Sequence, residues 1–174
     1  MHYPLRVRPG EPDFDGLPVL KLHCDVGVPI NERLYAQAQL GLCERCFFVR
    51  LWAFETQPLP DSRMTVLLEG PQGQLRLSAQ ASGTAALLLS GCERNDALTA
   101  WSFSGEDLQG EYWGMSLLMD AGLFYQTLGL SACDRSSCIR GNILKEQPSL
   151  SALFPVAPGH AADDPACFGQ WKLC

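Results

Sequence analysis

The chain has 174 residues, of which 47% are hydrophobic and 18% are charged, and its formal net charge is −6. This balance excludes an intrinsically disordered chain, and the length suffices to bury one sizeable core without disulfides or metal ions. The 13 Lys and Arg residues are scattered along the sequence, which excludes the concentrated positive surface that nucleic-acid binding requires. We therefore expect one folded domain covering residues 1–174.

The first ten residues contain no apolar run of the kind that directs secretion, and no later stretch approaches the roughly 20 apolar residues that span a membrane. The sequence therefore predicts a cytoplasmic protein without a membrane partner. Cysteines stay reduced in that compartment, so the eight cysteines are expected as free thiols that mostly behave as small buried hydrophobic side chains.

The first predicted elements lie in the N-terminal third. Residues 1–18 contain four prolines and two glycines, which favour an extended or irregular path along an edge of the fold rather than a helix. Residues 34–42 alternate between apolar and polar side chains, which predicts a strand with one buried face. Residues 46–54 are rich in aromatic and β-branched side chains and predict a central strand. The polar break at 44–45 makes these two strands a hairpin, and residues 55–62, with two prolines, predict a loop.

Further short apolar runs follow, separated mostly by glycine-rich turns. We expect strands at 64–69, 75–79, 85–90, 98–103, 113–119, 139–145 and 167–173. Asp120 is placed to cap a short helix over residues 120–128. Short strands at this spacing are typical of an all-β fold, an antiparallel two-sheet β-sandwich of the jelly-roll type with one short helix.

The four tryptophans lie within these strand-like runs, and most of them are expected in the core. Trp101 differs, because it follows a polar turn and is flanked by Ser102. Trp101 is therefore the best candidate among the four to face outward as a stacking platform for a ligand.

Three segments resemble, in the same order, strands of the family 9 carbohydrate-binding modules, a DOMON-like sandwich family. The first covers residues 47–55, the second begins at Tyr112-Trp113, and the third is Arg140-Gly141-Asn142-Ile143-Leu144-Lys145, which is similar to the Arg-x-Asn strand of the family. The resemblance covers most of the chain. It implies a two-sheet sandwich that is non-catalytic and binds a mono- or oligosaccharide at its end or concave face.

The resemblance also implies site residues. In sugar-binding members two tryptophans flank the ring and the Asn of the Arg-x-Asn strand binds hydroxyls, which implies Arg140 and Asn142 as binding residues here. Neither family tryptophan is present: residues 55–63 contain none, and residues 151–155 place Phe154 where the second would lie. Alternatively, Arg140 pairs with a carboxylate and Asn142 satisfies loop backbone groups. The chain would then be a structural or interaction protein that has lost the sugar site.

Other chemistries find little support in the sequence. Gly-x-Ser-x-Gly, glycine-rich phosphate-loop and His-Glu-x-x-His motifs are absent, so no enzymatic activity is predicted. Cys43 and Cys46 have the spacing of half a zinc site, which Cys133, Cys138 or a histidine would have to complete. The pair also straddles the predicted hairpin turn, where two thiols come close for local reasons, so no metal is predicted.

A haem-binding electron-transfer domain is a further alternative, because the broader sandwich superfamily contains such domains. Met64, Met115 or Met119 with His160 would be the available ligands. Met115 and Met119 already fit the apolar stripe of a strand, so no cofactor is predicted.

Overall fold

The computed structural model describes residues 2–25, 27, 29, 33–132 and 137–174. It consists of β-strands with one short helix, α1 (Ala121–Leu128), and short 3-10 turns that include η2 (Asn95–Ala97) and η3 (Pro165–Cys167). The strands are β1 (His2–Arg8), β2 (Leu20–Leu22), β3 (Cys24–Asp25), β4 (Ala36–Cys43), β5 (Cys46–Phe54), β6 (Arg63–Glu69), β7 (Gln74–Gln80), β8 (Ala85–Leu89), β9 (Cys92–Glu93), β10 (Leu98–Asp107), β11 (Gly110–Asp120), β12 (Cys138–Glu146), β13 (Ser151–Ala152) and β14 (Gly169–Leu173).

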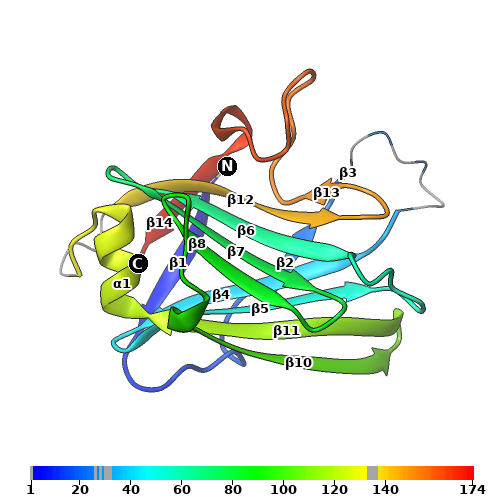
Figure 1. Cartoon of the computed structure of the whole chain (residues 1–174), viewed down its shortest axis with the longest axis horizontal. Helices are drawn as coiled ribbons and strands as arrows, with labels where there is room; N and C mark the ends of the chain where they lie inside the picture. Colours follow the sequence, from blue (N-terminus) through cyan, green and yellow to red (C-terminus); the bar gives the residue numbers. More distant parts are fainter. Residues whose placement is uncertain (1, 26, 28, 30–32, 133–136) are drawn as a thin grey trace.

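The strands pair in one continuous, curled sheet with the order β10-β11-β5-β4-β1-β14-β12-β6-β7-β8-β9. Its two halves face each other: β4, β5, β10 and β11 form one layer and β6, β7, β8 and β12 the other (Figure 1). Side chains from the inner sides of both layers form one large hydrophobic core, which α1 closes at one end. Among the described residues, no helix has the length and apolar character needed to cross a membrane.

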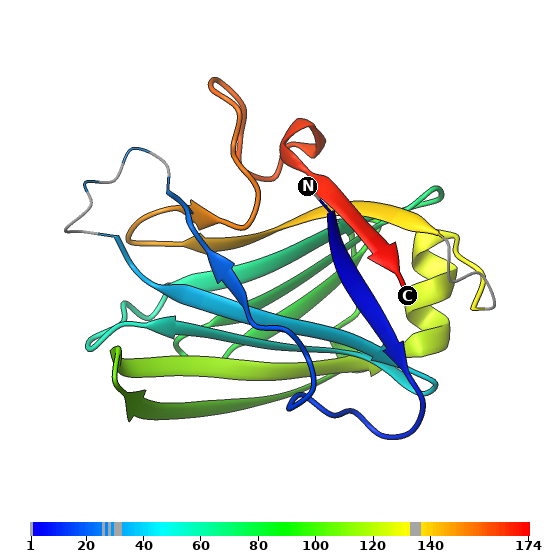
Figure 2. The same cartoon turned by 180° about the vertical axis from the view of Figure 1, so that it is seen from behind.

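The strands β1 and β14 connect the two layers and lie side by side in both views (Figures 1 and 2). Residues 2–5 of β1 pair in parallel with β14, and residues 6–8 pair in parallel with β4. The prediction that every strand pairs antiparallel is therefore wrong at β1, whereas the prediction of an extended or irregular entry segment agrees with this strand and the irregular residues after it. Pro4, which lacks an N–H group, is tolerated because β1 has only one paired neighbour at that position.

The positions of the remaining predicted strands and of the helix agree with the structure. Each strand predicted from alternation is present, and β10 and β11 are longer than predicted. Asp120 caps α1 by accepting a hydrogen bond from the backbone N–H of Leu123 at 2.8 Å. Gly129 ends the helix with a left-handed φ of 69°, a conformation that glycine adopts at little cost.

The strand β4 is buried on both faces, where the sequence predicted burial on one. Its outward side is covered by the segment that follows β1. Phe14 and Leu17 of this segment pack with Phe48, and the side chain of Gln39 donates hydrogen bonds to the carbonyl oxygens of Phe14 (2.9 Å) and Leu17 (3.1 Å). Local periodicity could not show this cover, because it comes from a segment about 20 residues away.

Candidate functional site

The side chain of Asn142 lies on the outward side of β12 beneath the C-terminal segment and is completely buried. Its Nδ2 donates to the carbonyl oxygens of Phe154 (3.1 Å) and Cys167 (3.0 Å). Its Oδ1 accepts from the backbone N–H groups of Ile143 (2.9 Å) and Phe154 (3.0 Å). These four bonds use the full capacity of the amide, so Asn142 attaches the C-terminal segment to the sheet.

Arg140 and Phe154 lie near Asn142 but do not form an open site with it. Arg140 is half exposed, with Nη1 at 3.6 Å from Glu69 Oε2 and Nη2 donating to the carbonyl oxygen of Pro165. Phe154 is 5% exposed and packs edge-to-face against Tyr3, with ring centroids 5.4 Å apart. Phe154 therefore anchors its segment in the core and offers no ring face to solvent.

Trp101 lies on a different surface from these three residues. Five strands separate β10, which carries Trp101, from β12 in the sheet order. Trp101 is 45% exposed and faces outward, as expected from the sequence. The four residues predicted as a sugar site therefore do not share one surface.

The surface around Trp101 is the outward side of β4, β5, β10 and β11, which we call the aromatic face. Residues directly opposite each other in an antiparallel pair lie on the same side of the sheet, so the register defines its members. They are Gln37, Gln39, Gly41, Phe48, Arg50, Trp52, Phe54, Thr99, Trp101, Phe103, Gly105, Tyr112, Gly114, Ser116 and Leu118, with Cys46, Asp107, Gly110 and Asp120 at the strand ends. Gln39, Gly41 and Phe48 lie beneath the segment that carries Phe14 and Leu17, so the exposed part of the face is the part around Trp101. The alternate residues of these strands face the core in β4, β5 and β11.

Glycines opposite aromatic residues shape this face. Phe103 is opposite Gly114, and a Cβ atom at Gly114 would lie 2.4 Å from Cζ of the Phe103 ring. Tyr112 is opposite Gly105 in the same way, and a Cβ atom there would lie 2.4 Å from its hydroxyl oxygen. The two rings therefore lean over the neighbouring strand and stay partly exposed, rather than standing upright from the sheet.

Trp52 and Arg50 belong to the aromatic face, and sequence reasoning missed both. Trp52 is partly exposed, where the sequence favoured a core position, whereas Trp113 and Trp171 are buried as expected. A usable signal was present: Trp52 has the same strand parity as the charged Arg50, and a charged side chain in mid-strand points away from the core.

A buried polar cluster lies at the end of the fold where β5 and β12 leave the core. The fully buried Lys145 donates from Nζ to Ser62 Oγ at 2.8 Å and lies 3.4 Å from Glu55 Oε1. Glu55 Oε2 accepts hydrogen bonds from Ser62 Oγ (2.7 Å) and Trp113 Nε1 (2.5 Å). Burial lowers the pKa of Lys145, while the charge of Glu55 opposes that shift. These groups satisfy one another and hold the strand ends together.

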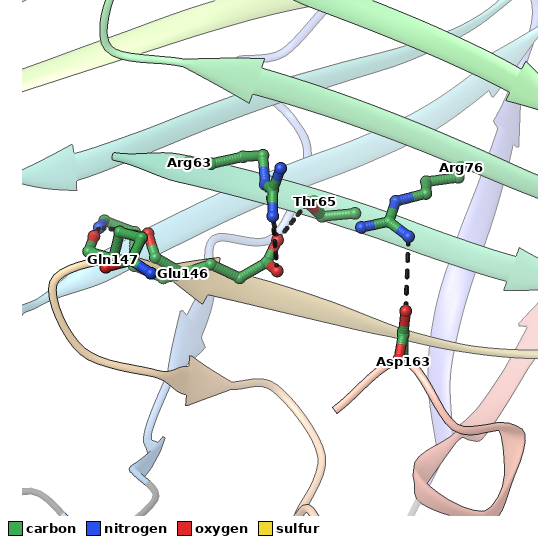
Figure 3. A network of polar contacts seen from close by, with 7 residues as sticks. Arg63, Thr65, Arg76, Glu146, Gln147 and Asp163 are labelled. Atoms are coloured by element: carbon green, nitrogen blue, oxygen red, sulfur yellow. Dashed lines mark hydrogen bonds and ion pairs between the residues drawn. The ribbon is translucent and has the colours of Figure 1, made fainter. Parts of the chain in front are cut away.

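A second polar cluster covers the outward side of β6, β7 and β12 (Figure 3). Arg63 donates from Nε and Nη2 to both carboxylate oxygens of Glu146 at 3.0 Å, and Thr65 Oγ1 donates to Glu146 at 2.7 Å. Arg76 reaches Asp163 of the C-terminal segment, 3.4 Å away. Burial would raise the pKa of Glu146, but the hydrogen bonds from Arg63 and Thr65 and the nearby guanidinium charges outweigh it and lower the pKa.

Among the residues it describes, the structure does not bring together the side chains that a zinc or haem site would need. Within the described ranges, no group of three or more His, Cys, Asp or Glu side chains lies together. The Sγ atoms of Cys43 and Cys46 are 3.4 Å apart as free thiols, and burial raises the pKa of Cys46 to about 12. Cys138 is exposed, and Cys133 lies outside the described residues.

The candidate haem ligands lie in different environments, the methionines in the core and His160 at the surface. Met64, Met115 and Met119 are buried in the main core. His160 is exposed in the C-terminal segment, where its Nδ1 lies 2.8 Å from Asp164 Oδ2. The methionines therefore fill the core, as the apolar stripe predicts.

No protein-family model matches the sequence, and a search of curated proteins found no match. Solved structures do match. A family 9 carbohydrate-binding module from Caldicellulosiruptor kristjanssonii in complex with glucose superposes with a TM-score of 0.66 at 10% identity, covering 98% of this chain and 95% of that one. The fold is that of the family 9 carbohydrate-binding modules. The same module in complex with cellotriose gives a TM-score of 0.66 over 99% of this chain and 93% of that one, also at 10% identity.

A protein from Bacteroides uniformis that is proposed to bind carbohydrate has the same fold, with a TM-score of 0.69 at 15% identity over 98% of both chains. The fold predicted from the Arg-x-Asn strand and its companions is thus confirmed. The family 9 fold here lacks tryptophans in residues 55–63 and 151–155, and it carries two partly exposed ones, Trp52 and Trp101, on the aromatic face.

Proposed function

We propose that this protein is a non-catalytic carbohydrate-binding module that holds a mono- or oligosaccharide on the aromatic face. The observation that carries the proposal is the outward position of Trp101, 45% exposed among other partly exposed aromatic side chains on one side of a sheet. The fold supports it, since structures of the same fold were solved with glucose and cellotriose. The cytoplasmic location expected from the sequence is part of this proposal.

The chemistry of the aromatic face suits a sugar. The C–H side of a pyranose ring stacks on an aromatic ring, and its hydroxyl groups need hydrogen-bond partners close by. Ser116 lies directly opposite Trp101, and Arg50 lies opposite Ser116 on the next strand. Ser116 is fully buried, so a sugar stacked on Trp101 would have the guanidinium of Arg50 within reach across the strands.

The test is the substitution Trp101→Ala. We expect the dissociation constant for the saccharide that binds to rise about tenfold, because the stacking contact is lost, with little change in thermal stability. Binding is measured by calorimetry after thermal-shift screening against glucose, xylose and cello-oligosaccharides. Leu108→Ala is the matched control, since Leu108 is a fully exposed hydrophobic residue in the turn of the same β10–β11 hairpin. Equal affinities of the two variants would contradict the proposed site.

An interaction protein without a sugar site is the second candidate. It is favoured by the burial of Asn142 and Phe154, two of the residues that the family resemblance assigns to sugar recognition. A flat thermal-shift response across the whole saccharide panel would support this candidate over carbohydrate binding.

A further inference from the structure

The guanidinium of Arg50 has an unusual environment on the aromatic face. Its central carbon lies 4.1 Å from the ring centre of Phe14 and 5.8 Å from that of Phe103. No hydrogen bond or ion pair joins this guanidinium to any residue that the structure describes. The two aromatic rings therefore hold a cation in place while its five N–H donors have no acceptor in the described part of the protein.

The charge of the aromatic face differs from that of the whole molecule. The chain carries 19 Asp and Glu residues and a net charge of −6. Two of these acidic residues have the outward parity of the face, Asp107 at the end of β10 and Asp120 at the end of β11, and none lies between them around Arg50. Lys21 of the neighbouring β2 lies over the ring of Tyr35, 5.6 Å from its centre, and adds a second cation beside the face. The middle of the face around Arg50 is thus positive, and the acidic residues of the face lie at the strand ends.

The residue between Trp101 and Arg50 is the small Ser116 of β11. It is fully buried between Trp101 and Arg50 in the strand register, and its Oγ has no hydrogen-bond partner among the described residues. With strands about 4.8 Å apart, the backbone positions of Trp101 and Arg50 are about 10 Å apart. One pyranose ring stacked on Trp101 can therefore extend a substituent over Arg50.

From this arrangement we infer that the aromatic face selects saccharides that carry a carboxylate, that is, uronic acid units. Trp101 stacks against the ring, and Arg50 pairs with the carboxylate through two parallel N–H donors. A guanidinium fixed by aromatic contacts is suited to this bidentate pairing, and a neutral hydroxymethyl group would leave its charge uncompensated. The inference rests on the proposed function and names the class of sugar that it would take.

The test uses glucuronate and glucose, which differ only at C6. With the unaltered protein, calorimetry at low salt is expected to give glucuronate at least a tenfold lower dissociation constant than glucose. This preference is expected to shrink as ionic strength rises, because screening weakens the ion pair and leaves stacking unchanged.

Two substitutions assign the preference to Arg50. Arg50→Gln is expected to abolish the preference for glucuronate. Arg50→Lys is expected to keep part of it, since lysine retains the charge but lacks the two parallel N–H donors of the guanidinium. Lysine also keeps a long apolar stem against Phe14, so Arg50→Lys remains informative if the glutamine variant fails to fold. Arg45→Gln is the matched control, because Arg45 lies in the exposed turn of the same hairpin.

The outcomes separate this inference from the function on which it rests. Binding of glucose with equal or higher affinity than glucuronate overturns the carboxylate inference and leaves carbohydrate binding standing. A glucuronate preference that persists in Arg50→Gln also overturns it, because another cation would then be responsible. If no saccharide binds, charged or neutral, both the carboxylate inference and the proposed carbohydrate-binding function are overturned.

Discussion

A single amide, that of Asn142, fixes the course of the C-terminal segment across β12. Its four hydrogen bonds go to backbone groups of Ile143, Phe154 and Cys167. The Arg-x-Asn pattern identifies the residue correctly as a polar position of special importance. It cannot tell whether the amide faces a ligand or the chain itself, since that depends on the path of residues 153–168, which have no periodicity.

Asn142→Ala is expected to destabilise the protein by about 2–3 kcal/mol, because buried backbone groups of two segments lose their partners. Urea unfolding measures the loss. Arg140→Ala on the same strand is the control and is expected to cost less than about 1 kcal/mol, since its side chain is half exposed. A folded Asn142→Ala protein is expected to keep the saccharide affinity of the unaltered protein. Loss of binding without loss of folding would show instead that Asn142 contacts the ligand.

Trp101 and Trp52 show how far the sequence predicts the direction of a side chain in a strand. The polar turn before Trp101 indicated correctly that this ring faces outward. Composition favours the core for Trp52, because its strand is rich in aromatic residues and lies in the middle of its layer. Parity within the strand, which places Trp52 beside Arg50, carries more information about its direction than composition does.

Among the elements, the paired strands β6 and β12 carry an ion pair whose strength depends on pH. Arg63 is directly opposite Glu146 in the register, and Thr65 on β6 also donates to this carboxylate. The lowered pKa of Glu146 means that the unfolded chain takes up this proton at a higher pH than the folded protein does. The stabilisation is therefore present above the ordinary Glu pKa and is lost as the pH falls through the lowered one.

Glu146→Gln is accordingly expected to reduce the free energy of unfolding near pH 7. The difference from the unaltered protein should shrink between about pH 5 and pH 3, where the carboxylate becomes protonated. Urea unfolding at several pH values measures both the destabilisation near pH 7 and its decrease at lower pH. Glu44→Gln, in the exposed β4–β5 turn, serves as the control. A difference that stays constant from pH 7 to pH 3 would show that Glu146 does not stabilise the fold as an ion.

The elements that alternation predicts are those whose two faces meet different environments. The strand β7 follows this rule. The strand β5, predicted from its aromatic and β-branched residues, is buried at most positions on both faces, and α1 was predicted with the help of its Asp120 cap. The strand β1 was missed because Pro4 argues against a ladder position, and only the one-sided pairing of residues 2–5 makes it tolerable. The four short strands of two or three residues, β2, β3, β9 and β13, are too brief for any period.

At the scale of the whole molecule, β1 joins the two layers by changing its partner from β14 to β4. Leu5 lies at this change and is fully buried in the main core. Leu5→Ala is expected to cost about 2–5 kcal/mol, because the cavity would open between the layers. Val19→Ala, at a 45% exposed position, is the control and is expected to be nearly neutral. A cost below about 1 kcal/mol in urea unfolding would show that the layers hold together without this contact.

The position of β1 and β14 also governs how the molecule can form. His2 pairs with Gln170, so the centre of the sheet is made from segments at opposite ends of this sequence. During synthesis each layer can assemble locally, yet the join between them has to wait for β14. Until then part of the edge of β1 and of β12 stays open to other chains, and contacts of such long range make folding slow. In newly made chains, association with other chains therefore competes with the pairing of β14 that completes the sheet.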